Sequence, residues 1–461
     1  MPDAAELTLR EAGRAIARGE LSPLELTRAC LERAGRLENA VKSFVMIDAD
    51  GALAQAEALT EELARSQPRS PIHGIPLGIK DIIDVRGLPT TASSRVLADN
   101  VARADAPVVA CLRERGGVVL GKTNTQEFAY GVVTAPTRNP WDLDRIPGGS
   151  SGGTAAAVAA GMCPGGLGTD TAGSIRIPAA LCGITGLKPR REGVPLEGIV
   201  ALSWSLDSCG PMGRSALDVD LLWGAMTGAP SARSWEERVH TLRSMRVAAP
   251  SSYQSLTEVD PEVEEATEDA LERLRGLGHR RVDVDLPAVR EWAPRAVLLM
   301  TEALVFHRQS GWYPDRSDDY SRETLDNLRH AESFTAADLV AAQRSLQPLQ
   351  ARFLAAFDEA DAIVLPSTPV PAPTIEEASR VPEEGGRRPV VLDLTSLCGP
   401  VNGMPLAAVG LPCGFTRSGL PIGMQIVAKE ESTALGLALS YQSVTDHHLR
   451  RPPLERLDAP A

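Results

Sequence analysis

The sequence predicts an α/β protein, with a single large domain whose central mixed β-sheet is covered by helices. Short apolar segments typical of strands alternate with segments of helical periodicity along the whole chain. No internal repeat or linker-like stretch divides the 461 residues, which are enough to bury a large core. We therefore expect one domain over residues 1–461.

The N-terminal residues 1–66 are predicted to form a helical wrap. Ser22 and Glu25 make a capping-box pattern with Pro23 between them, which marks the start of a helix. A second, alanine-rich helix is expected over residues 52–64. Neither helix carries a pattern that indicates catalysis.

The first core strand is predicted just before Lys80. Leu77 and Ile79 alternate with Gly78 and Lys80, so the lysine falls near the end of the strand. A lysine in such a place usually extends to solvent. Its apolar neighbours here also allow a buried, desolvated amine.

Residues 116–123 match the phosphate-binding pattern G-x-x-x-x-G-K-[ST], but we do not expect a nucleotide site. In a phosphate-binding loop the middle residues curl around the phosphate after a strand. Here residues 118–120 are Val-Val-Leu and are predicted to be that strand, following a helix over residues 107–115 and preceding a turn at residues 121–124.

Two glycine-flanked serines, Ser150 and Ser174, lie within residues 147–178. Glycines beside serine let backbone N–H groups converge on a ligand. One such cluster is usually a turn or a linker. Here a nearly all-alanine segment, residues 154–161, joins the two and predicts a buried helix. The stretch therefore indicates a functional site.

Strand-like and helical segments continue to alternate beyond residue 216. Four aromatic residues in its helical part are interpreted as core rather than as the lining of a pocket; they are Trp292, Trp312, Tyr313 and Tyr320. The expected elements are short strands at 246–250 and 282–284, a helix over 261–276, mostly helix over 288–360, a charged loop at 376–389, and two strands within 402–425.

A serine nucleophile needs a base, because a free hydroxyl is a poor nucleophile at neutral pH. The pattern around Ser150 fits a nucleophile elbow, which normally goes with a later histidine. Only His447 and His448 come late enough, and they lie near the polar C-terminus. Lysine is the remaining candidate base, because Ser–Lys pairs are a known variant of the catalytic triad.

These blocks together resemble the amidase signature family, whose members use a Ser-cisSer-Lys triad. The matching segments, in order, are Gly78–Asp81, Gly121–Asn124, Asn139–Asp142, Gly148–Gly153, Asp170–Arg176, Ser205–Asp207 with Gly210-Pro211, and Gly419–Gln425. The resemblance covers nearly the whole chain. It implies the amidase signature fold, with a signature core at residues 71–215 and the remainder of the α/β domain at residues 216–461.

The resemblance also implies roles for individual residues. Ser174 is expected to be the nucleophile, Ser150 the proton shuttle after a cis peptide bond, and Lys80 the base, kept neutral by desolvation. No metal and no organic cofactor is expected. The oxyanion hole would come from backbone N–H groups of Thr171, Ala172, Gly173 and Ser174.

Supporting roles are expected for Ser151, Asp170 and Arg176. Arg176 could clamp an acidic substrate, since arginine pairs well with planar carboxylates. We prefer a structural pairing with Asp170, because a buried arginine beside a glycine-rich loop needs a fixed partner. That preference predicts a mainly uncharged pocket that favours neutral amides.

Three departures from the family pattern concern the pocket and its loops. Ala172 replaces a common glycine, residues 188–193 differ from the usual sequence, and the link at residues 131–139 is short.

The amino-acid composition limits the kinds of binding partner that we expect. The net charge of −13 argues against direct nucleic-acid binding, whose affinity depends on basic residues. Seven scattered cysteines without a CxxC pair indicate reduced thiols, and no run is apolar enough for a membrane span. We expect a cytoplasmic protein with a small-molecule amide as substrate, no nucleic-acid or membrane partner, and a possible homodimer.

The first expected function is an amidohydrolase that cleaves a small carboxamide through a serine acyl-enzyme, releasing ammonia or an amine and a carboxylic acid. The alternative is the glutaminase component, known as the A subunit, of an aspartyl/glutamyl-tRNA amidotransferase, in which a partner would hold the tRNA. A non-catalytic scaffold is the third interpretation, against which the intact Lys80, Ser150 and Ser174 argue.

Overall fold

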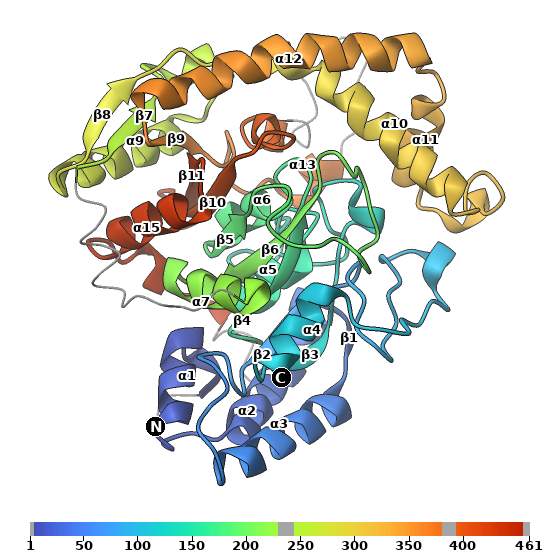
Figure 1. Ribbon diagram of the computed structural model, residues 1–461, viewed down its shortest axis with the longest axis vertical. Helices are drawn as coiled ribbons and strands as arrows, with labels where there is room; N and C mark the ends of the chain where they lie inside the picture. Colours follow the sequence, from blue (N-terminus) through green and yellow to red (C-terminus); the bar gives the residue numbers. More distant parts are fainter. Residues whose placement is uncertain (1–3, 229–243, 380–392, 455–461) are drawn as a thin grey trace.

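A computed structural model describes residues 4–228, 244–379 and 393–454. The described residues form one mixed sheet of 11 strands in the order β1-β3-β2-β4-β6-β5-β10-β11-β9-β7-β8, with helices packed around it (Figure 1). The predicted fold class, a single α/β domain with a central mixed sheet covered by helices, is confirmed.

The sheet combines parallel and antiparallel pairs. Strand β2 runs parallel to both β3 and β4, and β7 runs parallel to β8 and β9, whereas the other neighbours are antiparallel. The strands are β1 Phe44–Ile47, β2 Pro76–Lys80, β3 Val118–Thr123, β4 Gly165–Asp170, β5 Thr185–Lys188, β6 Ser208–Gly213, β7 Arg246–Ala249, β8 Arg280–Asp283, β9 Ala362–Pro366, β10 Ala407–Phe415 and β11 Pro421–Ala428.

The helices follow the predicted starts closely. Ser22 makes the capping box with Glu25, and Asp260 caps its helix by accepting from the Glu262 N–H. The helices are α1 Leu9–Ala17, α2 Pro23–Val41, α3 Ala49–Leu63, α4 Pro107–Glu114, α5 Gly152–Ala159, α6 Arg176–Cys182, α7 Ala216–Thr227, α9 Pro261–Gly276, α10 Pro294–Gln309, α11 Arg322–Ala331, α12 Ala336–Glu359, α13 Ile375–Ser379 and α15 Glu431–Gln442.

Two local predictions were wrong. The predicted turn at residues 121–124 is largely strand, because β3 continues to Thr123 and Gly121 pairs with Ile47 of β1. The first residues of the predicted charged loop at 376–389 belong to α13, which begins where Thr374 and Glu377 cap each other. Residues 380–389 of that loop lie outside the described residues.

The N-terminal segment packs at one end of the molecule (Figure 1). It contains helices α1, α2 and α3, but also the edge strand β1, which pairs antiparallel with β3. The wrap is therefore tied into the sheet by backbone hydrogen bonds as well as by helix packing.

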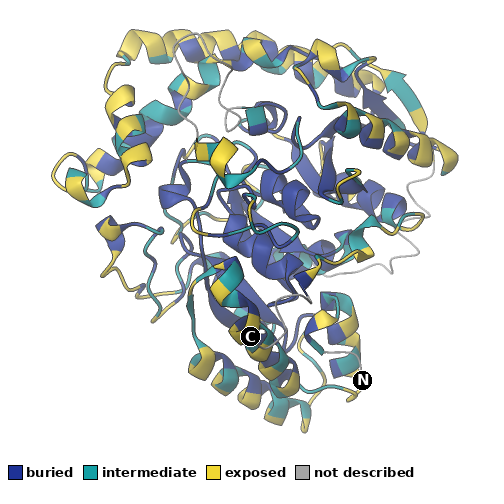
Figure 2. Ribbon diagram, turned by 180° about the vertical axis from the view of Figure 1, so that it is seen from behind, coloured by how far each residue is buried: buried dark blue, intermediate teal, exposed yellow. Residues whose placement is uncertain are grey.

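Helices α10, α11 and α12 form an arm at the opposite end (Figure 1). The predicted core role of the aromatic residues is confirmed for Trp292, Tyr313 and Tyr320, which are buried, and Trp312 packs against Phe128. Burial differs sharply between arm and centre: α12 is widely exposed, whereas α5 and α6 are buried along their whole length (Figure 2). The small side chains of α5 permit this close packing.

Candidate active site

Lys80 ends β2 in the interior of the sheet. Both neighbours of β2 run parallel to it, and all five residues of the strand are buried. The Lys80 Nζ donates hydrogen bonds to Ser150 Oγ at 2.7 Å and to Thr169 Oγ1 at 2.8 Å. Burial lowers the pKa of Lys80 to about 7, although the carboxylates of Asp207 and Asp170 oppose the shift.

Ser150 precedes helix α5, and the Gly149–Ser150 peptide bond is cis. The Ser150 carbonyl accepts hydrogen bonds from the Gln126 N–H at 3.2 Å and from Thr134 Oγ1 at 3.3 Å. A side chain on Gly149 would collide with Thr134. The close approach of these two loops therefore requires the glycine.

Ser174 lies on the loop between β4 and α6, next to the Ser150 loop. The Ser151 N–H donates to the Ser174 carbonyl at 3.1 Å, while Ser151 Oγ donates to the Thr169 carbonyl and accepts from its N–H. Ser151 thus joins both serine loops to the end of β4. The structure brings Lys80, Ser150 and the Ser174 loop into one buried region.

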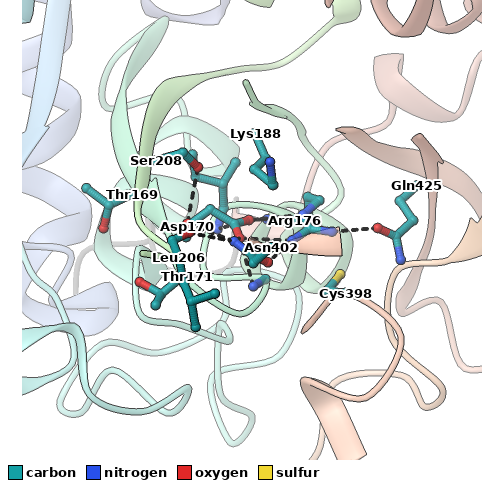
Figure 3. Close-up of polar contacts among 12 residues, drawn as sticks. Thr169, Asp170, Thr171, Arg176, Lys188, Leu206, Ser208, Cys398, Asn402 and Gln425 are labelled. Carbon is teal, nitrogen blue, oxygen red and sulfur yellow. Dashed lines mark hydrogen bonds and ion pairs between the residues drawn. The ribbon is translucent and has the colours of Figure 1, made fainter. Parts of the chain in front are cut away.

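Asp170 and Arg176, at the two ends of the Ser174 loop, form a fully buried ion pair (Figure 3). Two parallel hydrogen bonds of 3.0 and 2.9 Å join them, and the guanidinium also donates to Gln425 and Asn402 at 2.7 Å each. Burial alone would raise the pKa of Asp170, but the charge and hydrogen bonds of Arg176 hold it well below its usual range. This geometry agrees with the structural pairing that we preferred for Arg176.

The Asp170 carboxylate also shapes the predicted oxyanion hole. It accepts hydrogen bonds from the N–H groups of Gly173 at 2.8 Å and Ile175 at 3.1 Å. The Gly173 N–H is therefore occupied, which differs from the prediction of four free donors. Within the described part of the chain, the N–H groups of Thr171, Ala172 and Ser174 have no acceptor.

The sequence did not identify Thr169 as a functional residue. Asp207 was named only as part of the Ser205–Asp207 segment that resembles the amidase signature family, without a role. Asp207 accepts from Thr171 Oγ1 at 2.5 Å and from the N–H groups of Leu202 and Ser203, and burial raises its pKa to about 6. A cavity of about 350 Å³ opens beside these groups. Its walls include the polar Thr169, Thr171 and Asp207 and the apolar Ile82, Leu196 and Val200.

Known proteins share both the sequence and the fold that build this site. Residues 25–435 match the model of the family described as Amidase. The A subunit of glutamyl-tRNA(Gln) amidotransferase from Chloroflexus aggregans is 36% identical over 493 residues, which cover 98% of this chain and 99% of that protein. A crystal structure of an amidase superposes with a TM-score of 0.84 at 32% identity, covering 95% of this chain and 99% of that one. The corresponding A subunit from Thermotoga maritima gives a TM-score of 0.77 at 30% identity, covering 95% and 94%.

These relatives contradict the partner prediction made from net charge. Proteins named as one component of a glutamyl-tRNA(Gln) amidotransferase resemble this chain over nearly its whole length. A charge of −13 averages over the whole surface, whereas contact with a nucleic acid depends on local charge or on another protein in the complex. Net charge therefore does not exclude a nucleic-acid partner, nor restrict the partners to a small amide and a second copy.

Helices of the described residues are all too short or too polar to cross a bilayer. The family match spans far more than half of the sequence, and the full-length relatives exceed 30% identity. The chain belongs to the amidase (amidase signature) family, whose members are enzymes that act on C–N amide bonds.

Proposed function

We propose that this chain is the A subunit of a glutamyl-tRNA(Gln) amidotransferase and hydrolyses the side-chain amide of glutamine to supply ammonia. The observation that carries this choice is the similarity of nearly the whole chain to proteins of that name. We place the activity in the cytoplasm, because all seven cysteines are free thiols. This is the second of the two functions expected from sequence.

The proposed chemistry uses a Ser-cisSer-Lys triad. Ser174 Oγ attacks the amide carbon and gives its proton to Ser150 Oγ, whose own proton passes to neutral Lys80 Nζ. The proton then returns through Ser150 to the nitrogen of the tetrahedral intermediate, whose C–N bond breaks to release ammonia and leave an acyl ester on Ser174. Water cleaves the ester in the same way to give the acid. The 2.7 Å contact between Lys80 and Ser150 supports this route.

We assign the oxyanion hole to the free N–H groups of Thr171, Ala172 and Ser174. Donors fixed before the reaction stabilise developing negative charge without reorganisation. Asp170 supports this arrangement, because its carboxylate accepts a hydrogen bond from the intervening Gly173 N–H and so fixes the loop.

A stand-alone amidase is the second candidate. It is favoured by the higher structural similarity to the amidase, with a TM-score of 0.84 against 0.77 for the Thermotoga protein.

The test separates the two candidates. Glutamine hydrolysis is measured with the purified chain alone and after addition of the other amidotransferase subunits and glutamyl-tRNA(Gln). We expect strong stimulation by the complete assembly and loss of all activity in Ser174→Ala. Unstimulated hydrolysis of simple amides faster than glutamine would favour the stand-alone amidase instead.

The nucleophile can be located directly. A serine-reactive fluorophosphonate should label Ser174, because this residue is the proposed nucleophile and lies on the loop that carries the free N–H donors. Peptide mass spectrometry of the labelled protein identifies the residue. An adduct on Ser150 would reverse the two serine roles.

A further inference from the structure

Glu302, on α10 of the arm, has a buried carboxylate whose hydrogen-bond donors all come from one loop of the central domain. It accepts from Ser203 Oγ at 2.6 Å, from the Ser205 N–H at 3.0 Å and from Ser205 Oγ. Among the residues that the structure describes, no lysine, arginine or histidine forms an ion pair with Glu302. Because a buried carboxylate is costly without donors, these three hydrogen bonds fix the loop to the helix.

The loop that Glu302 holds forms one wall of the cavity at the candidate active site. Residues 196, 197, 199–202, 204, 207 and 208 all line this cavity. Trp204 lies between the two serines that Glu302 binds, so the backbone is held on both sides of this lining residue. Glu302 lies outside the lining, and its effect on the site therefore passes through the loop.

The same loop is joined to the predicted oxyanion hole through Asp207. The Asp207 carboxylate accepts from the Ser203 N–H at 3.0 Å and from Thr171 Oγ1 at 2.5 Å. Ser203 thus donates its hydroxyl to Glu302 and its backbone N–H to Asp207. The backbone N–H of Thr171 is one of the three donors that we assign to the oxyanion hole. A continuous path of hydrogen bonds therefore connects α10 with that donor.

We propose that Glu302 is a positioning residue for the oxyanion hole, where it fixes the direction of the Thr171 N–H through Ser203 and Asp207. The inference rests on the proposed serine chemistry and goes beyond it, because it gives a helix of the arm a part in turnover. An oxyanion-hole donor acts only when it points to the place where negative charge develops. Misdirection of this donor should weaken the transition state more than the bound substrate.

The first test compares Glu302→Gln with Glu431→Gln in steady-state hydrolysis of glutamine by the complete assembly. Glu431 is the matched control, because it is also a buried carboxylate but accepts from the Arg190 N–H and Nε on another loop. Glutamine keeps the shape of glutamate but replaces one acceptor oxygen with an NH₂ group.

Loss of a whole oxyanion-hole donor costs about 10²- to 10³-fold in kcat. A donor that is only misdirected should cost less, so we expect Glu302→Gln to lower kcat by about tenfold and to change KM by less than about twofold. Glu431→Gln should keep both constants. A rise in KM with kcat unchanged, or equal losses of kcat in the two variants, would overturn the proposal.

The second test needs no substrate and uses the purified chain with a fluorophosphonate. Attack of Ser174 places negative charge on the phosphoryl oxygen, which the same N–H donors stabilise. The rate of labelling at Ser174 should fall about tenfold in Glu302→Gln and stay at the wild-type value in Glu431→Gln. If wild type is labelled at Ser174 but the complete assembly does not hydrolyse glutamine, the proposed function fails. The ratio of labelling rates still decides the role of Glu302.

A double-mutant cycle tests the path through Thr171. Thr171→Val removes the hydroxyl that donates to Asp207. If Glu302 acts through this contact, the double variant should be labelled about as slowly as the slower single variant, because both changes release the same donor. Losses that multiply would show two separate effects and refute the path. Glu431→Gln combined with Thr171→Val should show the loss of Thr171→Val alone.

Ser205→Ala approaches the same contact from the loop and guards against failure of Glu302→Gln to fold. It removes one of the three donors to Glu302 and leaves the carboxylate and Asp207 in place. Labelling at Ser174 should slow by about threefold, in keeping with the loss of one hydrogen bond, while circular dichroism matches that of wild type. A folded Ser205→Ala protein that is labelled at the wild-type rate would contradict the positioning role.

Discussion

The surroundings of Lys80 and Lys188 differ in one respect that decides what each lysine can do. Both side chains are buried in the central sheet, and burial lowers the pKa of each to about 7. Lys80 donates to the hydroxyls of Ser150 and Thr169, whereas Lys188 donates to the carbonyls of Pro189 and Leu406.

A hydroxyl can reverse its role and a carbonyl cannot. Neutral Lys80 can accept the Ser150 proton, but the lone pair of neutral Lys188 faces no proton donor among these partners. A low pKa therefore makes a lysine available as a base only where an acidic hydrogen lies within reach.

The largest expected effect is on turnover. Lys80→Ala should lower kcat by about 10²- to 10⁴-fold, the usual contribution of a general base. Lys188→Met should leave kcat nearly unchanged, because no substrate proton passes through it. Steady-state kinetics on glutamine at pH 8 checks both variants, with circular dichroism to confirm folding. Similar losses of kcat in the two variants would contradict the proposal that only Lys80 acts as a base.

The pH profile should report the Lys80 amine. Because only the neutral form accepts a proton, kcat/KM should fall about tenfold per pH unit below the pKa of about 7 and level off above it. Rates from pH 5.5 to 8.5 test this. A flat profile with chemistry rate-limiting would contradict the role of neutral Lys80.

A single hydroxyl should tune that pKa. Thr169→Val keeps the shape of the side chain but removes an acceptor that favours the ammonium form. Loss of about 1 kcal/mol of hydrogen-bond energy corresponds to about 0.7 pH unit. The acidic limb of kcat/KM should move to lower pH by this amount, and a shift to higher pH would argue against the assigned contact. Thr267→Val, a buried threonine at α9, is the matched control.

The last expected effect concerns stability, and here the two lysines should behave alike. Each has a folded-state pKa of about 7, below its ordinary value of 10.5, so the unfolded chain binds one more proton between these values. Each lysine should therefore make the free energy of unfolding rise with pH by about 1.4 kcal/mol per unit in this window.

Denaturant titrations at pH 7.5 and 9.5 measure this slope. Lys80→Met and Lys188→Met should each reduce it by a similar amount relative to wild type, and the comparison with wild type cancels other titrating groups. An unchanged slope in either variant would show that its lysine does not titrate with a lowered pKa.

The sequence predicted local features better than long-range ones. The position of Lys80 near the end of a strand, the helix starts at Pro23 and Pro261, and the buried alanine helix α5 all follow from patterns within a few residues. The family and the fold class were likewise predicted. The contact between Lys80 and Thr169 joins residues far apart in sequence, and no local pattern predicts it.

The same limit explains one of the errors, because extension of β3 through residue 123 depends on pairing with β1, a partner more than 70 residues away. The occupied Gly173 N–H has a local cause instead: it donates to the Asp170 carboxylate, only three residues earlier in the chain. Partner expectations failed because net charge carries no information about other proteins in a complex. Of the two functions named in advance, the comparisons favour the amidotransferase component over the small-molecule amidase.

The contrast between a wholly buried α5–α6 centre and an exposed arm has an evolutionary consequence (Figure 2). Almost any substitution in the centre disturbs close packing, whereas the outer surface of α12 tolerates change. Descendants of such an enzyme can therefore inherit the reaction intact while the outer surface of α12 changes freely.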